Sequence, residues 1–264
     1  MNFEIKERYT YEDLLRVMEI LRSENGCMWD KEQTHQSIRE NFIEEVYEAA
    51  EAIDTGDAEL LKEELGDVLF QVVFHAQIER EKGVFDMDDV ADGICKKMIY
   101  RHPHVFGSTT VSSTGEVLAN WDALKSEEKH ESTVTAQLER VAKTLPALVR
   151  AQKIQKKAGK VGFDWENVQD ALGKVHEELE EVERAVNGDG DPAEELGDLL
   201  FATVNIARFI GANSEQTLER TCQKFISRFA YIERAALAQG KTLDELTLEQ
   251  MDELYHEGKA HEKS

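Results

Sequence analysis

The sequence is poor in residue types that would point to a disulfide, a metal–thiolate or a β-rich protein. Only three of its 264 residues are proline and three are cysteine. Scarce proline, together with plentiful Glu, Leu, Ala and Lys, favours helices over strands. The cysteines (Cys27, Cys95 and Cys222) lie far apart and form no Cys-x-x-Cys pair, so neither a zinc site nor a dithiol redox site is predicted. We expect an all-α protein with reduced thiols.

Basic residues are also few. The chain has 31 Lys and Arg against 54 Asp and Glu, a formal net charge of −23. Nucleic acids and anionic membranes attract basic surfaces, so neither is an expected partner.

No run approaches the roughly 20 apolar residues of a membrane span, and no basic-then-apolar leader opens the sequence, so the cytoplasm is the expected compartment. The G-x-x-x-x-G-K-[ST] loop is missing as well, which excludes a P-loop nucleotide site.

What the chain does contain is an internal repeat. EELGDVLFQVVFHA at 63–76 matches EELGDLLFATVNIA at 194–207. Flanking blocks follow in the same order in both copies: IEEVYE with HEELEE, KMIYR with KFISR, and WDALK with YHEGK. Such self-similarity indicates a duplicated unit. We predict an N-terminal lobe at 1–127, a connection at 128–145 and a C-terminal lobe at 146–264, each containing a helical hairpin.

Local signals mark several helix ends. Asp191 followed by Pro192 predicts a helix start, because the Asp side chain can accept a free N–H and proline has no N–H to leave unpaired. Thr247 and Gln250 predict a capping box at the last helix. Pro103, inside the block RHPHVF, predicts a helix stop, and we assign its neighbouring histidines no chemistry.

Each hairpin carries two pairs of carboxylates. A spacing of three residues puts both members of a pair on one helix face. The pairs are Glu178 with Glu181 and Glu195 with Asp198 in the C-terminal lobe, and Glu45 with Glu48 and Glu64 with Asp67 in the N-terminal lobe. One such pair alone would indicate a solvated acidic face. Asp67 and Asp198, however, lie in helices that are apolar almost all the way round, so we expect both to be buried and in need of a partner.

Four clustered carboxylates predict a divalent cation. At a spacing of about 4 Å and an effective dielectric constant of 20, each pair of anions would repel by roughly 4 kcal/mol. Carboxylate oxygens suit Mg²⁺ or Mn²⁺, whereas the Glu-x-x-His pairs of ferritin-like di-iron proteins do not occur in the hairpins. Mg²⁺ held by carboxylates keeps positions for water and phosphate oxygens, which points to a polyphosphate substrate.

Basic residues at helical spacing fit an anionic substrate. Alone, each would be interpreted as surface charge, and their recurrence in both copies favours a site. The candidates are Lys174, one turn before Glu178, and two pairs with one-turn spacing, Lys224 with Arg228 and, in the other lobe, Lys97 with Arg101.

Together these features resemble the MazG-type nucleoside triphosphate pyrophosphohydrolases. The similarity covers nearly the whole chain and includes NGCMWDKEQT, RHPHVF, LPALVRAQKIQKKAGKVGFDW and both EELGD blocks. The carboxylate motif is shared with the wider all-α NTP pyrophosphatase superfamily, whereas the tandem lobes and flanking blocks single out MazG. The resemblance implies a homodimer, packed through its hairpin helices, that hydrolyses ribo- and deoxynucleoside triphosphates to nucleoside monophosphate and pyrophosphate with Mg²⁺, for which Mn²⁺ would substitute.

The resemblance also implies residue roles. Glu178, Glu181, Glu195 and Asp198 would hold the metal; Lys174, Lys224 and Arg228 would contact phosphates; Tyr255 would lie against the nucleotide, with Lys259 nearby. The family often has Trp in place of Tyr255, so the stacking surface here is smaller. The metal would neutralise the triphosphate and acidify the attacking water, and Glu177 or another unliganded carboxylate would accept the proton. The N-terminal counterpart site would comprise Glu45, Glu48, Glu64, Asp67, Lys97 and Arg101.

The two lobes differ beside their carboxylates. The N-terminal copy has Asn41 where the C-terminal copy has Lys174. A lysine there offsets charge that builds on a phosphoryl oxygen under attack, so we expect turnover mainly in the C-terminal lobe. The alternative, from a different class, is a non-enzymatic acidic helical dimer that acts as a regulatory interaction module. It predicts no turnover and folding that is insensitive to metal.

Overall fold

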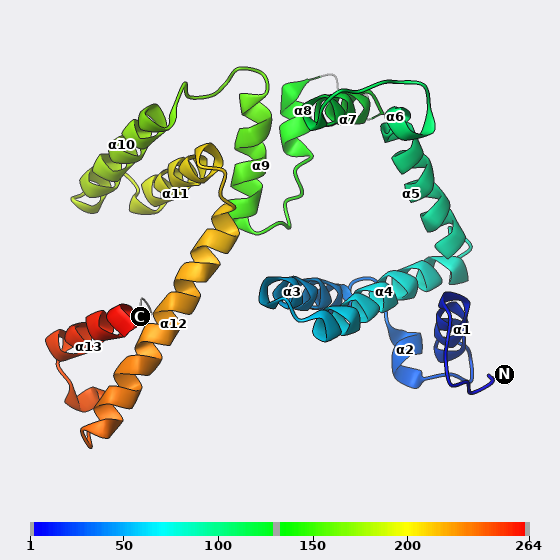
Figure 1. Cartoon of the computed structure of the whole chain (residues 1–264), viewed down its shortest axis with the longest axis horizontal. Coiled ribbons are helices and arrows are strands. Elements are labelled where there is room, and N and C mark those ends of the chain that lie inside the picture. The colour runs from blue at the N-terminus through cyan, green and yellow to red at the C-terminus, as the bar shows by residue number, and fades with distance from the viewer. Residues whose placement is uncertain (1–2, 129–132, 262–264) are drawn as a thin grey trace. The chain divides into compact units, whose positions relative to one another are not determined.

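The computed structural model describes residues 3–128 and 133–261, and every regular element in these ranges is a helix (Figure 1). The predicted all-α fold is therefore confirmed. The chain divides into two compact units, Met1–Lys129 and His130–Ser264. Within the described ranges, no helix combines the length and the apolar character needed to cross a membrane.

The N-terminal unit contains the hairpin of α3 (Arg39–Thr55) and α4 (Ala58–Glu81). Gly56 closes α3 at a φ of 73°, a backbone conformation that favours glycine. Asp57 then caps α4 by accepting the first free N–H groups of that helix. The other helices described in this unit are α1 (Tyr11–Leu21), α2 (Met28–Glu32), α5 (Met87–Arg101), α6 (Pro103–Phe106) and α7 (Thr114–Glu128).

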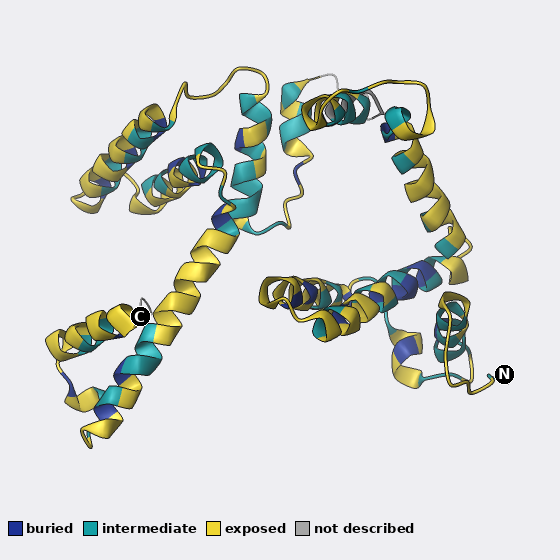
Figure 2. Ribbon diagram, viewed as in Figure 1, coloured by how far each residue is buried: buried dark blue, intermediate teal, exposed yellow. Residues whose placement is uncertain are grey.

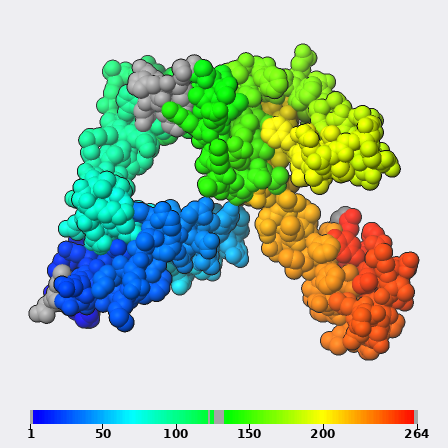
Figure 3. Space-filling model, turned by 180° about the vertical axis from the view of Figure 1, so that it is seen from behind, coloured from blue at the N-terminus to red at the C-terminus, as the bar shows by residue number. Residues whose placement is uncertain are grey.

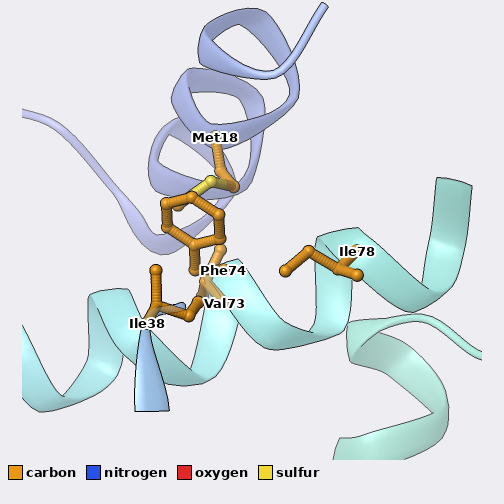
Figure 4. Packing of buried hydrophobic residues seen from close by; sticks show 5 residues of the cluster. All are labelled: Met18, Ile38, Val73, Phe74 and Ile78. Carbon is orange, nitrogen blue, oxygen red and sulfur yellow. The ribbon is translucent and has the colours of Figure 1, made fainter. Parts of the chain in front are cut away.

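The core of this unit joins α1 to α4. It consists of Met18, Ile38, Val73, Phe74 and Ile78, all buried (Figure 4). Burying one such side chain contributes roughly 1.5–3 kcal/mol, so the cluster holds α1 and the start of the hairpin against the C-terminal half of α4. Helix α1 was not foreseen as a partner of the hairpin.

The C-terminal unit contains the hairpin of α10 (Val168–Val186) and α11 (Pro192–Phe209). The predicted start of α11 is confirmed: Asp191 accepts the N–H of Ala193, and Pro192 is the first helical residue. The remaining elements described in this unit are α8 (Val134–Glu139), α9 (Ala147–Gly159), α12 (Ser214–Ala238), a short 3₁₀-helix (Leu243–Glu245) and α13 (Leu248–His261).

Helices pack against this second hairpin as well. Helix α9 lies against α11, in the way that α1 lies against α4, and α8 packs on α9. Helix α8 falls inside 128–145, the segment predicted as a connection, so part of that segment belongs to the fold of the C-terminal unit. Gln155 of α9 is buried and donates to the carbonyl of Phe201, which ties α9 to α11.

The helix ends predicted at Pro103 and Thr247 also appear. Helix α5 ends at Arg101, and Pro103 starts the short α6. At the last helix, Thr247 and Gln250 exchange side-chain to backbone hydrogen bonds, so the capping box is confirmed.

The second half of α12 forms a small core of its own with α13. Ile232, Ala236 and Leu246 are buried there, and Gly258 lets α13 approach closely, since a Cβ at that position would lie 3.2 Å from the Cβ of Tyr231. In Figure 3 the orange and red surface of this pair stands apart from the yellow-green surface of the α10–α11 hairpin. Side chains on α13 therefore belong to a different part of the unit from those on the hairpin.

Candidate functional site

The C-terminal hairpin brings three carboxylates together. Glu178 and Glu181 of α10 and Glu195 of α11 each place one carboxylate oxygen within 4.8 Å of the other two. Glu178 is only 5% exposed, and its Oε2 is buried without a hydrogen-bond partner among the described residues. A buried anionic oxygen without a donor is costly, and a bound cation would remove that cost.

The clustering of these carboxylates shifts the pKa of Glu195. Burial raises the pKa of the Glu195 carboxyl, and the neighbouring charges of Glu181 and Asp198 raise it further. All donors are carboxylate oxygens, the ligands that hard divalent cations such as Mg²⁺ prefer. The residues present therefore fit the divalent ion that the sequence predicts.

The predicted burial of Asp67 and Asp198 is wrong for a single chain. Both are exposed, and the buried carboxylates are instead Glu64 and Glu178. The apolar residues that surround the two aspartates along their helices are left partly uncovered, as Leu196 shows at 49% exposure. Asp198 is not one of the three close carboxylates, and it lies at their edge, where it lines the adjoining cavity.

Lys174 is held against the cluster. Its Nζ lies 2.8 Å from a carboxylate oxygen of Glu177 and 2.6 Å from one of Glu178. Hydrogen bonds to these two carboxylates raise the pKa of Lys174 above its ordinary value, so it is a cation at neutral pH. Glu177, the candidate proton acceptor, is exposed and pairs with Lys174, and it does not line the cavity.

A cavity of about 540 Å³ adjoins the carboxylates, with Lys174, Glu178 and Asp198 in its wall. Its apolar wall comes from α8, α9, α11 and the loop after α9, and its polar wall includes Gln155, Asn205 and Arg208. Sequence reasoning missed this cavity. The block VGFDW was noted only for its family resemblance, and its two aromatic residues in a polar loop were the available signal.

The remaining residues that the resemblance assigns to the nucleotide form a separate group on α12 and α13. The guanidinium of Arg228 lies over the ring of Tyr255, 5.3 Å from its centre, and Lys224 and Lys259 are exposed. None of these four side chains lines the cavity beside Glu178. Within one chain the structure therefore does not join them to the carboxylates.

The N-terminal hairpin repeats the carboxylates. Glu45, Glu48 and Glu64 place oxygens within 4.8 Å of one another. Burial raises the pKa of Glu45 and of Glu64, and the neighbouring carboxylates, Asp67 among them, add to the effect. In the C-terminal cluster, burial and neighbouring carboxylates likewise raise the pKa of Glu195. The sequence repeat therefore places clustered carboxylates with raised pKa values in both hairpins.

The repeat extends to the later helices. Arg101 of α5 lies over the ring of Trp121 on α7 at 5.5 Å, as Arg228 lies over Tyr255. This equivalence follows the predicted match between WDALK and YHEGK. Lys97, the partner of Arg101 in the predicted counterpart site, is exposed.

An all-α chain with two carboxylate-bearing hairpins fits the class of metal-dependent nucleotide hydrolases, and the comparison with known families agrees. The model of the MazG nucleotide pyrophosphohydrolase domain matches residues 33–106 and 166–232, segments that include both hairpins. The chain belongs to the MazG family.

Relatives match nearly the full length. The "Nucleoside triphosphate pyrophosphohydrolase" of Escherichia coli (strain K12) is 44% identical over 254 residues, which cover 94% of this chain and 97% of the relative. The Thermotoga maritima "Nucleoside triphosphate pyrophosphohydrolase/pyrophosphatase MazG" is 42% identical over 257 residues, or 96% of this chain and 97% of the relative. YabN of Bacillus subtilis is 48% identical over 96% of this chain, which spans 52% of that longer protein.

Proposed function

We propose that this protein hydrolyses ribo- and deoxynucleoside triphosphates to nucleoside monophosphate and pyrophosphate, with Mg²⁺ and mainly in the C-terminal lobe. Family membership and the names of the relatives support the reaction. The observation that carries the choice of site is the buried Glu178, whose Oε2 has no described partner, in a three-carboxylate cluster beside Lys174 and a cavity.

The residues of the C-terminal site have the following proposed roles. Glu178, Glu181 and Glu195 would hold Mg²⁺, with Asp198 at the edge of the set. Bound there, Mg²⁺ would neutralise phosphate charge and acidify the attacking water. Lys174, oriented by its carboxylate partners, supplies a fixed positive charge where charge grows on the attacked phosphoryl group. Glu177 or another carboxylate outside the metal set accepts the proton of the water.

The outer faces of the hairpins support a homodimer as part of this proposal. Exposed stretches run along both hairpins (Figure 2). Leu196 and Leu200 of α11 are about half exposed, and the corresponding residues of α4, Leu65 and Leu69, are exposed as well. Contiguous apolar surface of this kind on a helical protein indicates a protein interface. A monomeric mass by light scattering at micromolar concentration would contradict the dimer.

Product analysis tests the reaction. Purified protein incubated with ATP and Mg²⁺ is expected to release AMP and pyrophosphate. Initial release of ADP and inorganic phosphate would contradict cleavage between the α- and β-phosphates. An absence of turnover, together with a melting temperature that does not respond to Mg²⁺, would favour the regulatory interaction module.

A further inference from the structure

The segment 140–163 has a charge opposite to that of the chain as a whole. It contains seven Lys and Arg and no Asp or Glu, although the full chain has a net charge of −23. The helix at its centre, α9, supplies Arg150, Lys153, Lys156 and Lys157 and contains no acidic residue. Helix α9 is therefore a basic element of a strongly acidic protein.

Three lysines of α9 form one face, named here the lysine face. Lys153 and Lys156 are exposed and Lys157 is half-buried, and their spacing puts them on one side of the helix. Ile154 and Ala158, on the other side, line the cavity next to α11. Among the described residues, none of the three lysines has an ion-pair or hydrogen-bond partner. The lysine face therefore presents its charge to solvent.

Ordinary helix stabilisation accounts for only part of this charge. Lys156 and Lys157 lie in the last turn of α9, where a positive charge interacts favourably with the helix dipole. That effect is confined to the last turn, and Lys153 lies before it. Ion pairs with acidic residues one turn away are the other usual role of helical lysines, and α9 has no acidic residue to form them. The charge of the whole face needs a different explanation.

The other copy of the repeat carries the opposite charge on this helix. LLRVMEILR at 14–22 aligns with LVRAQKIQK at 148–156 with three identities, and α1 packs on α4 as α9 packs on α11. Glu19 stands at the position of Lys153 and forms an ion pair with Arg16. Helix α1 has three acidic residues and one basic residue, whereas α9 has four basic residues and no acidic one. The basic charge therefore belongs to the copy in which we propose turnover.

A positive charge on α9 matters because the proposed substrate is a polyanion. A strongly acidic protein repels a nucleoside triphosphate at long range, and a basic surface close to the site reverses that force locally. An α-helix with its side chains is about 10–12 Å across, little more than the Debye length of about 8 Å at physiological ionic strength. The field of the lysine face therefore extends past α9 toward the hairpin, and it extends further at low salt.

We propose that the lysine face of α9 attracts the triphosphate electrostatically and speeds its association with the C-terminal carboxylate site. The inference rests on the function proposed above. The three lysines guide the approach of the substrate, and no described contact joins them to Glu178 or Lys174. A long polyanion such as a nucleic acid fits this face less well, because it would also meet the acidic surfaces of the same unit, whereas a triphosphate is small enough to avoid them.

Stopped-flow association of a fluorescent mant derivative of α,β-methylene-ATP, with Mg²⁺, measures the effect without turnover. The triple variant Lys153→Gln, Lys156→Gln and Lys157→Gln should associate about 5- to 10-fold more slowly than the wild type at an ionic strength of about 20 mM. At about 0.5 M salt the difference should shrink to less than about 2-fold, because salt screens the attraction. The dissociation rate should change little, as is usual when charges outside a contact are removed.

A charge-matched control removes three lysines from the other unit. Lys62, Lys82 and Lys96 each pair with a carboxylate of their own helix or its end, and changing all three to Gln alters the net charge by the same amount. This control should associate within about 2-fold of the wild type. Lys153→Glu, which imports the residue of the N-terminal copy, should slow association more than Lys153→Gln does.

Steady-state kinetics separates guidance of the substrate from a direct catalytic role. At low salt the triple variant should show a lower kcat/KM for ATP, with kcat at saturating ATP within about 2-fold of the wild type. A fall in kcat with an unchanged association rate would overturn the inference. So would wild-type association at low salt, an equal loss in the charge-matched control, or a loss that persists undiminished at about 0.5 M salt.

These outcomes also distinguish the inference from the proposed function. Unchanged association in the triple variant, while the wild type hydrolyses ATP, overturns the guidance by α9 alone. Failure of the wild type to hydrolyse ATP overturns the proposed function instead. If the triple variant does not fold, Lys153→Glu changes one exposed position and gives the same salt-dependent readout, and wild-type association in that variant at low salt would overturn the inference.

Discussion

The two hairpins present nearly the same carboxylates in front of different interiors. Behind α4, Phe74 and Met18 are completely buried and fill the space next to α1 (Figure 4). In the repeat that pairs residue 63 with 194, Phe74 corresponds to Asn205, which with Gln155 of α9 lines the open cavity behind α11. At this position the N-terminal copy has a packed aromatic side chain, whereas the C-terminal copy has a cavity.

This difference shows which properties a duplicated scaffold keeps. The carboxylate clusters depend only on residues spaced along two facing helices, so both copies retain them. A ligand cavity depends on what the third helix and the inner face of the second helix supply. An aromatic side chain at that position closes the space, and a shorter polar one leaves it open. The comparison therefore supports the proposal that turnover belongs mainly to the C-terminal copy and that the N-terminal copy is mainly structural.

The strongest test of this comparison removes the corresponding carboxylate from the first hairpin helix of each copy. Glu178→Gln should lower kcat by more than about 1,000-fold, because a metal ligand and the partner of Lys174 are lost together. Glu45→Gln should stay within a few-fold of the wild type. Steady-state ATP hydrolysis at saturating Mg²⁺ measures both, and the opposite ranking in folded variants would refute the assignment.

The same variants test the metal. Binding to the native state alone adds about 2.7 kcal/mol to the free energy of unfolding at a hundredfold excess of Mg²⁺ over Kd. Glu178→Gln should therefore weaken the rise in melting temperature that Mg²⁺ produces. A full rise in this variant would show that the metal binds elsewhere.

A second test targets the filled interior. Phe74→Ala should lower the free energy of unfolding by about 3–5 kcal/mol, because it leaves a void in a packed core. Asn205→Ala at the corresponding position should cost less than about 1 kcal/mol, since its side chain borders a cavity that already exists. Urea unfolding measures both variants. Equal losses would contradict the contrast between the two interiors.

A third test exchanges the residue beside the carboxylates. Lys174→Asn, which imports the N-terminal residue, should lower kcat by about 10²- to 10³-fold, typical for the loss of a preorganised charge at the transition state. The reverse change, Asn41→Lys in a Glu178→Gln background, should restore no turnover, because Phe74 still fills the space behind α4. Activity in that double variant would mean that the lysine alone separates the two lobes.

The smallest expected effect concerns pH. His75 Nδ1 lies 2.7 Å from His35 Nδ1. Burial lowers the pKa of His75 from its ordinary value of 6.5, and the neighbouring His35 lowers it further. Glu79 contacts His35, and Lys82 contacts Glu79. The folded state favours neutral His75, so its contribution to stability is present above about pH 6.5 and is lost as the pH falls. The corresponding C-terminal residue, Ile206, does not titrate.

Thermal melts should show this as a stability loss of less than about 1 kcal/mol between about pH 7.5 and pH 5.5. His75→Gln should reduce the loss. Equal pH dependence in this variant and the wild type would remove His75 as its source.

The sequence determined on its own everything that depends on residues close together in the chain. Helical periodicity, the cap at Asp191 and the capping box at Thr247 follow from hydrogen bonds within a few residues. The three-residue carboxylate spacing and its repetition are local features of the same kind, and together with the flanking blocks they indicate the MazG family.

Only the tertiary structure decided which carboxylate is buried and where the cavity lies. Glu178, and not Asp198, is the enclosed acid, because burial depends on which helix faces meet and not on the apolar character of one helix. The cavity gathers side chains from α8 to α11, and Arg208 reaches Asp164 across 44 positions of sequence. Such contacts are set by the packing of distant elements, which no local pattern encodes.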